Sequence, residues 1–262
     1  MDLTVPEIRQ KLQTADAAEF AVLERSLVAD TRKGVRQAVE VARRRLAAER
    51  EEEARLAGMY AFERELAAER GGSVVLGLDE VGRGPLAGPL AVGGVVLDPE
   101  APIAGLNDSK QVRPEDRERI AAEVREGAVA WTVQYVQPDE IDRLGMTAAL
   151  RQAFRAAIAE VEAAGVSVDV VLLDGNPLHL DEREVSVVKG DGKCASIAAA
   201  SLVAKVARDN LMVEYAALYP GYGFESNKGY GSEGHMEAIR EKGLTPLHRR
   251  SFCSFAAQET LF

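Results

Sequence analysis

The chain has 262 residues, 47% of them hydrophobic, which allows one large domain or one domain with an appendage. Its formal net charge of −10 argues against a protein that only coats nucleic acid, because phosphate contacts favour a basic surface, but it suits an enzyme that carries an acidic cluster. The two cysteines form no motif, and we see neither a signal pattern nor an apolar run long enough for a bilayer, so we expect a cytoplasmic protein without a membrane segment.

Residues 1–70 are predicted to be a helical extension. They are rich in Ala, Glu, Arg and Leu, and their apolar residues recur at helical spacing, which indicates two or three helices with a charged outer face. The simplest interpretation of Arg43–Arg45 beside Glu49–Glu53 is pairing of residues four apart on a solvated helix, with nucleic-acid contact as the alternative. Gly71-Gly72 breaks the pattern, so we expect a second domain over 71–262.

The second region alternates strands and helices. Its apolar runs at 74–78 and 170–173 are typical of strands buried on both faces. Hairpin-like strands come first and a strand–helix–strand order follows, which favours a mixed sheet flanked by helices over a purely parallel one. A loop is expected at 220–230 and an irregular tail at 245–255. Strands are predicted at 74–79, 90–97, 129–136, 169–174 and 185–189, and helices at 114–126, 147–164, 192–217 and 231–241.

The stretch VVLGLDEVGRGPLAGPL carries the strongest chemical signal. An apolar strand leads into the adjacent acids Asp79 and Glu80, and a loop with Gly82, Arg83 and Gly84 follows. Carboxylates suit hard divalent cations, glycines let backbone approach a partner, and arginine can bind a phosphate with two hydrogen bonds. Neighbours on a strand point to opposite faces unless the strand ends there, and a strand end would let both acids reach one site. The structural alternative is an ion pair between Arg83 and one acid.

Two more acids lie where elements end. Asp174 closes the apolar run VVLLD, and Asp191 lies in KGDGK before a long helix. Strand ends that meet at one sheet edge are the usual place for a site, and such acids can hold two Mg²⁺ or Mn²⁺ ions for a phosphoryl displacement. The alternatives are a turn former for Asp174 and a helix cap for Asp191. Asp209 is interpreted as a surface partner of Arg208 and is left out of the set.

Six motifs occur together and in order: DEVGRGPLAGP at 79–89, LNDSK at 106–110, LDGN at 173–176, KGDGKCASIAAASLVAKVARD at 189–209, YPGYGFESNKGYGSEGH at 219–235 and TPLHRRSF at 245–252. The set resembles ribonuclease HII, the bacterial type 2 ribonuclease H, over residues 73–255. The first seventy residues lie outside these motifs, although some members of the family carry a similar helical extension.

The resemblance implies a ribonuclease H-like α/β fold with a mixed sheet, in which 71–262 is the catalytic domain with a helical, substrate-binding C-terminal part. It implies hydrolysis of the RNA strand of RNA–DNA hybrids and incision on the 5′ side of single ribonucleotides in duplex DNA, leaving 3′-hydroxyl and 5′-phosphate ends. We expect a monomer that uses two Mg²⁺ or Mn²⁺ ions. The family's four catalytic, metal-binding acids fall on Asp79, Glu80, Asp174 and Asp191.

The resemblance also places substrate-binding residues. The Gly-Arg-Gly element falls on Gly82, Arg83 and Gly84, where bare backbone can sense a 2′-hydroxyl, and the junction-sensing tyrosine falls on Tyr230. A tyrosine in such a loop can alternatively serve only packing. His235 and His248 are interpreted as structural histidines rather than proton shuttles. Candidate phosphate contacts that position the substrate are Lys110, Lys193 and Lys228.

Three other functions were weighed. A resolvase-like or transposase-like DNA nuclease can use a similar acidic sheet, but it has no need of a 2′-hydroxyl reader. A nucleic-acid-binding module without activity would use the acids only for folding. A nucleotide-cofactor enzyme is disfavoured, because GRGPLAG lacks the spacing of a dinucleotide loop and no phosphate-binding Gly-Lys-Ser/Thr occurs.

Overall fold

The computed structural model describes residues 3–257. The chain forms two compact units, Met1–Ala57 and Gly58–Phe262. The division falls within one long helix, α3 (Lys33–Glu69), which contributes its first part to one unit and its last turns to the other. The domain boundary expected at Gly71-Gly72 comes just after this helix and stays a prediction.

The first unit consists of helices, as predicted. α1 (Val5–Thr14) and α2 (Ala17–Leu27) pack with the start of α3 around Ile8, Leu12 and Phe20. Asp16 caps α2, because its carboxylate accepts hydrogen bonds from two backbone N–H groups of the first turn, each at 2.8 Å. In the arginine run, Arg45 pairs with Glu49 as expected, whereas Arg44 pairs with Glu40 and Arg43 pairs with Glu24 of α2 and with Glu40.

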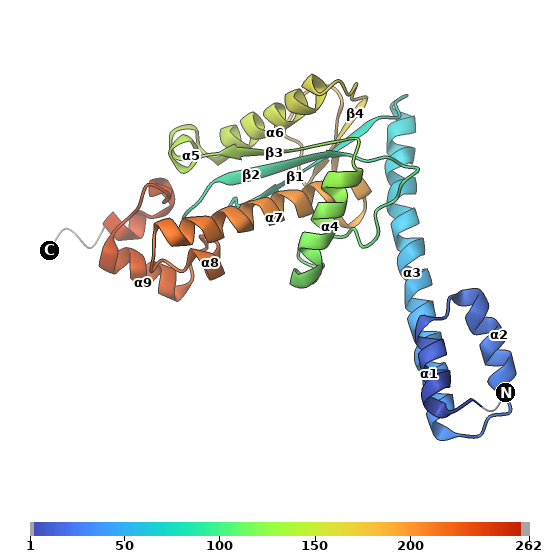
Figure 1. The fold of residues 1–262 in the computed structure, drawn as a ribbon. Coiled ribbons are helices and arrows are strands. Elements are labelled where there is room, and N and C mark those ends of the chain that lie inside the picture. Colours follow the sequence, from blue (N-terminus) through green and yellow to red (C-terminus); the bar gives the residue numbers. More distant parts are fainter. Residues whose placement is uncertain (1–2, 258–262) are drawn as a thin grey trace. The chain divides into compact units, whose positions relative to one another are not determined.

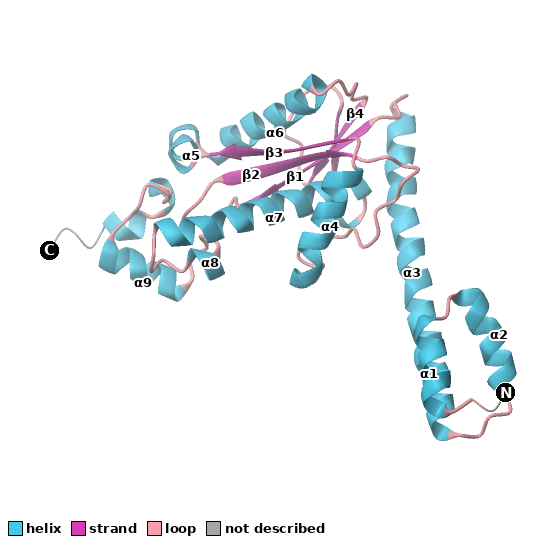
Figure 2. Cartoon of the chain, in the orientation of Figure 1, coloured by secondary structure: helices cyan, strands magenta, loops and turns pink. Residues whose placement is uncertain are grey.

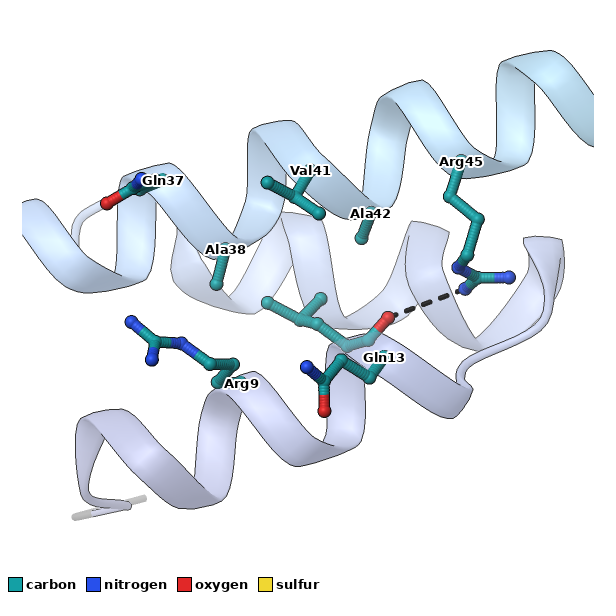
Figure 3. Close-up of a pocket in the computed structure, with 8 residues that line it drawn as sticks. Arg9, Gln13, Gln37, Ala38, Val41, Ala42 and Arg45 are labelled. Carbon is teal, nitrogen blue, oxygen red and sulfur yellow. Dashed lines mark hydrogen bonds between the residues drawn. The ribbon is translucent and has the colours of Figure 1, made fainter.

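A cavity of about 360 Å³ lies between α1 and α3 in this unit (Figure 3). Arg45 closes one end of it, and its guanidinium donates to the carbonyls of Leu12 and Ala15 at the end of α1. The aliphatic side chains of Ala38, Val41 and Ala42 form the α3 wall of the cavity. The arginine thus supplies hydrogen-bond donors to orphan carbonyls of a helix end.

The second unit is built on a five-stranded mixed sheet with the order β3-β2-β1-β4-β5 (Figures 1 and 2). β1 pairs antiparallel with β2 and parallel with β4. All five predicted strands are present, within two residues at each end. The strands are β1 (Val75–Val81), β2 (Leu90–Val96), β3 (Ala130–Val136), β4 (Val170–Asp174) and β5 (Glu184–Val187).

One difference in the sheet bears on the site. β1 was predicted to end at residue 79, but it continues to Val81, with Glu80 opposite Val92 and Val81 opposite Ala91 on β2. Pairing with the neighbouring strand extends β1 beyond its apolar run. Asp79 and Glu80 are therefore consecutive residues within a continuing strand and are not its last residues.

Helices cover both faces of the sheet (Figure 1). α6 (Met146–Ala163) packs on the face of Leu76, Leu78 and Leu173. α7 (Ala195–Leu218) lies on the other face, very close to it, because a Cβ added to Gly77 would lie 2.2 Å from the backbone of Ser196. Residue 77 must therefore be a glycine for α7 to approach the sheet this closely.

The remaining helices of the described chain complete the unit. α4 (Pro114–Gly127) contacts α7, and α9 (Glu233–Lys242) packs with the C-terminal segment. Two short helices were not predicted, α5 (Pro138–Leu144) and α8 (Phe224–Asn227), since one or two turns give too few residues for a periodic pattern. No helix in residues 3–257 is both long and apolar enough to cross a bilayer.

Candidate active site

The central carboxylate is Asp79. Only 7% of its surface is exposed, and its strand places it on the α7 side of the sheet. Burial, and then the negative charge of Glu80, raise its pKa well above the ordinary value, while the Ser201 hydroxyl of α7 acts in the opposite direction. The N–H of Glu80 donates to Asp79 Oδ1 at 2.8 Å. Few donors thus oppose the cost of burying this charge, and a bound cation would reduce that cost.

Glu80 has a partner. Arg83 Nη1 donates to its Oε1 at 3.1 Å, so the ion pair considered as a structural alternative is present. Burial raises the pKa of Glu80, the Arg83 charge lowers it, and the charge of Asp174 raises it again. Since Asp174 affects the pKa of both Glu80 and Asp79, all three carboxylates share one electrostatic environment.

Asp174 and Asp191 are joined through one loop. Asp174 ends β4 beside β1, and its Oδ1 accepts a hydrogen bond from the N–H of Gly190 at 2.6 Å. This bond holds the KGDGK loop against the strand end. Burial and then the charge of Asp174 raise the pKa of Asp191. The predicted acids of the two strands and of this loop therefore lie near one another.

Asp191 does not cap α7. The helix begins at Ala195, later than predicted, and its cap residue is Cys194. The first turn is bound instead by Glu63 of α3, whose Oε2 accepts from the N–H and the hydroxyl of Ser196, both at 2.8 Å. Asp191 lies before this turn in a short 3₁₀ helix, so its carboxylate is left for another role.

A cavity of about 530 Å³ opens beside Asp174 and Asp191. Within residues 3–257, no three Asp, Glu, His or Cys side chains form a ready-made metal-binding group. Lys110 is exposed in the cavity wall, and Lys193, also on the wall, donates to the carbonyl of Val188 at 2.8 Å. Lys228 lies elsewhere, in the 227–230 turn, where its ammonium binds the carbonyl of Glu225. Two of the three predicted phosphate-binding lysines thus line the acidic cavity.

The predicted surface pair of Arg208 and Asp209 is wrong. Asp209 pairs with Lys205 at 2.9 Å, while Arg208 is fully buried. Its guanidinium donates to three carbonyls, those of Pro89, Lys228 and Ala87, at 2.9, 3.0 and 3.2 Å. The adjacent acid in the sequence favoured a solvated side chain for Arg208. The available signal is its place seven residues after Ser201, on the face of α7 that packs on the sheet.

The loop after β1 is fixed from within. Gly82 and Gly88 have φ angles of +89° and +88°, and a Cβ on Gly82 would lie 2.4 Å from Arg208 Nε. Arg249, also fully buried, donates to carbonyls of the same loop. Arg249 was not predicted as a site residue, because the surrounding TPLHRRSF reads as an irregular tail.

Tyr230 lies next to this loop. The carbonyl of Gly229 accepts hydrogen bonds from the N–H groups of Leu86 and Ala87, at 2.9 and 3.2 Å, which ties the tyrosine turn to the segment after the glycine loop. The Tyr230 side chain is 44% exposed. Backbone bonds hold the turn in place, and the tyrosine is partly exposed rather than part of the core.

Two buried histidines support the same turn. His248 Nδ1 accepts from the N–H of Thr245 at 2.9 Å, so its Nε2 carries the proton and donates to His235 Nε2 at 3.1 Å. His235 Nδ1–H then donates to the carbonyl of Tyr230 at 2.8 Å. Burial lowers both pKa values, that of His248 to about 4 with help from His235. Both rings are neutral at pH 7, in agreement with a structural role.

Comparison with known proteins decides the family. The model of the ribonuclease HII family matches residues 76–255, and that of the ribonuclease HII N-terminal domain matches residues 4–67. The ribonuclease HII of Bacillus licheniformis is 42% identical over 260 residues, which is 98% of this chain and 99% of the relative. The chain belongs to the ribonuclease HII family. It is accordingly a nuclease, a hydrolase with ribonuclease H activity, and the family likeness also includes the helical first unit.

Solved structures agree on the fold. The ribonuclease H2 of Pyrococcus horikoshii has a TM-score of 0.61 and 26% identity, covering 71% of this chain and 98% of that one. Bst ribonuclease HIII in complex with Mn²⁺ has a TM-score of 0.61 and 23% identity, covering 75% of this chain and 73% of that one. The mixed sheet with helices on both faces, predicted from the sequence, is thus the ribonuclease H fold of these proteins.

Proposed function

We propose that this ribonuclease HII family member hydrolyses the RNA strand of RNA–DNA hybrids and incises duplex DNA on the 5′ side of a single embedded ribonucleotide, with two divalent ions, leaving 3′-hydroxyl and 5′-phosphate ends. The observation that carries the proposal is the buried, weakly compensated Asp79 carboxylate, close to Glu80 and Asp174 and beside a loop of bare backbone. A site that served only folding would not keep a buried carboxylate with so few hydrogen-bond donors, because its burial lowers stability.

The carboxylates suit Mg²⁺ or Mn²⁺. Asp79, Glu80, Asp174 and Asp191 offer hard oxygen ligands. Burial raises the pKa values of Asp79, Glu80 and Asp191, and neighbouring negative charge raises them further, a cost that a cation would relieve. Mg²⁺ is usually held by one or two carboxylates with water and substrate phosphate completing the shell, so no preformed cage of three side chains is needed. Bst ribonuclease HIII, which shares the fold, was solved with Mn²⁺.

Divalent ions supply, when bound, an activated water and stabilisation of the leaving oxygen in an in-line displacement. The protein side chains hold and orient. Gly190 N–H fixes the carboxylate of Asp174, and the N–H of Glu80 donates to that of Asp79. The Arg83 charge favours the ionised form of Glu80 against the effect of burial, and the Arg83 side chain is itself exposed, so it can also contact a phosphate.

Recognition of ribose is assigned to the loop and the tyrosine. A 2′-hydroxyl both donates and accepts hydrogen bonds, and the backbone of Gly82, Arg83 and Gly84 can meet it because no bulky side chain stands between. The exposed ring of Tyr230 offers a flat surface for the sugar beyond the ribonucleotide. Lys110, Lys193 and Lys228 are assigned to phosphates, where they position the duplex without reading sequence. A monomeric, cytoplasmic state stays a prediction.

The test is a cleavage assay on three matched duplexes: DNA with one ribonucleotide, an RNA–DNA hybrid, and all-DNA. With Mg²⁺ or Mn²⁺ we expect cutting of the first two only, with 3′-hydroxyl and 5′-phosphate ends, and no cutting in a chelator. Cutting of all-DNA would favour a resolvase-like nuclease. Binding without any cutting, with or without metal, would favour a module without activity.

A further inference from the structure

Arg249 donates hydrogen bonds to carbonyls of the loop that follows β1, the strand of Asp79. It comes from the C-terminal segment, is fully buried, and donates from Nη2 to Gly82 O at 2.6 Å and from Nη1 to Arg83 O at 3.0 Å. Nη2 and Nε also donate to Gly88 O, at 2.8 and 3.0 Å. One planar guanidinium thus pulls three backbone carbonyls toward the interior.

These hydrogen bonds determine where the N–H groups of the loop point. None of the described peptide bonds is cis, so within each peptide plane the C=O and the following N–H point in opposite directions. With Gly82 O and Arg83 O turned inward to Arg249, the N–H groups of Arg83 and Gly84 are turned outward. Two consecutive outward N–H groups make a small concave donor site for an oxygen.

The neighbouring amides have other partners, but these two do not. The N–H groups of Leu86, Ala87 and Gly88 all donate to backbone carbonyls. Those of Arg83 and Gly84 find no acceptor within residues 3–257. A Cβ added to Gly84 would meet nothing within 4 Å, so the space beside the Gly84 Cα is open.

We propose that Arg249 is a positioning residue for ribose selectivity: by binding the carbonyls of Gly82 and Arg83 it holds the N–H groups of Arg83 and Gly84 toward the 2′-oxygen of the ribonucleotide. The inference rests on the proposed incision at ribonucleotides and adds the residue that orients the sensor. Arg249 itself does not touch the substrate in this arrangement.

The residue type matches the task. Only arginine offers several N–H donors in a fixed plane, whereas a lysine ammonium is one compact group that cannot span three carbonyls. Phe252 packs on the guanidinium at 5.3 Å from the ring centroid and keeps its plane in place. Burial and the adjacent Arg208 lower the pKa of Arg249 to about 9, so it keeps its charge at neutral pH.

The test compares the affinity for a duplex with one ribonucleotide with that for the all-DNA duplex. It uses full-length Asp79→Asn protein with Mg²⁺, in which cleavage is too slow to deplete the duplex during the measurement. We expect the ratio of the two Kd values to fall about tenfold when Arg249→Lys is added, as for the loss of one or two hydrogen bonds. Affinity for the all-DNA duplex should stay within twofold or so. In the protein with Asp79, Arg249→Lys should also slow incision at the ribonucleotide, with unchanged Mn²⁺ affinity.

Arg155→Lys is the matched control, because Arg155, among residues 3–257, also donates to backbone carbonyls, those of His179 and Leu180. It should leave the ratio unchanged. If Arg249→Lys does not fold, Phe252→Leu replaces it, with a smaller fall in the ratio expected. The inference is overturned if Arg249→Lys leaves the ratio of the two Kd values unchanged. It is also overturned if that ratio is already near one in the protein that has Arg249. Failure of the unmodified protein to incise the ribonucleotide duplex overturns the proposed function instead.

Discussion

Buried charges are poorly compensated by hydrogen bonds at the acidic strand ends but fully compensated around the glycine loop beside them. Asp79 is buried with few donors and next to like charges, so its pKa is raised. Arg208 and Arg249 are buried just as deeply, but every polar nitrogen of theirs that lies out of solvent has a hydrogen-bond partner among the described residues. An incompletely compensated charge marks a place that a ligand completes, whereas a fully bonded charge marks scaffold.

The largest expected effect comes from removing the uncompensated charge. Asp79→Asn should lower cleavage by roughly 10²–10³-fold or more, as for loss of a central electrostatic group. It should also stabilise the metal-free protein. The raised pKa means that the folded state loses stability as pH rises through and above the ordinary pKa of aspartate, and the amide removes that loss. We expect the Tm at pH 7 without metal to rise by about 2–4 °C, the shift that 1 kcal/mol produces at this size.

Asp209→Asn is the matched control, since Asp209 pairs with Lys205 outside the acid set. It should change neither cleavage nor the Tm appreciably. Full cleavage by Asp79→Asn would remove this carboxylate from the metal site. A lowered Tm would show that Asp79 is a satisfied structural group, and the contrast between the two regions would disappear.

The second effect tests the loop side. Tyr230→Ala should slow incision at a single ribonucleotide by about 10- to 100-fold, the value of one aromatic stacking contact. Tyr230→Phe separates the ring from its hydroxyl and should keep most of the rate if the ring face is what matters. Tyr135→Ala, an exposed tyrosine on edge strand β3, is the control. Equal rates for the Tyr230→Ala variant and the unmodified protein would place junction recognition elsewhere.

The histidine pair gives a pH test of the scaffold. The pKa of His248 is lowered to about 4, so the unfolded state binds more protons than the folded state below the ordinary value. Stability is therefore fully present above about pH 6.5 and is lost as pH falls toward about 4, by roughly 1–3 kcal/mol in total. A second proton would place two N–H groups face to face in the 3.1 Å contact.

His248→Asn should flatten this dependence, since the amide oxygen still accepts from Thr245 but does not titrate. Urea unfolding at several pH values between 4 and 7 measures the slope. The same slope in His248→Asn as in the unmodified protein would mean that the titration arises from other groups.

The smallest effect is expected from the phosphate contacts. Lys110→Ala should weaken duplex binding only a few-fold, equally for every sequence, and should lower the slope of log K against log salt by about 1. Lys33→Ala, an exposed lysine of the first unit, serves for comparison. A variant that changes the preference for ribonucleotides would show that Lys110 reads the substrate rather than positions it.

The sequence predicted the sheet well, because continuous apolar runs such as those of β1 and β4 signal buried strands wherever they pair. The end of β1 was placed too early, since Glu80 and Val81 are strand only through their partners on β2. Asp79, Glu80, Asp174 and Asp191 were named in advance, whereas Asp108, which also lines the cavity beside Asp174 and Asp191, was not. How their oxygens are arranged around ions is outside what a linear pattern can give.

The buried arginines could not be predicted from local pattern. Charged residues are almost always solvated, and Arg208 lies beside Asp209 in the sequence, so a surface ion pair was predicted for it; burial was not predicted for Arg249 either. Their burial depends on carbonyls supplied by glycine-rich segments far away in the chain. Such carbonyls become available only when positive φ angles at Gly82 and Gly88 turn the backbone inward.

Glu63 determines where the chain can be shortened at its N-terminal side without loss of stability. It belongs to the last turns of α3, yet it accepts hydrogen bonds at the start of α7, the helix that carries Ser201 and Arg208. A shortened protein that starts at Gly58 keeps this cap, whereas one that starts at Gly71 leaves a buried N–H without an acceptor, at a cost of about 1–3 kcal/mol. The catalytic machinery thus extends upstream of its own first strand, and trimming at the glycine pair would loosen the helix beneath the acids.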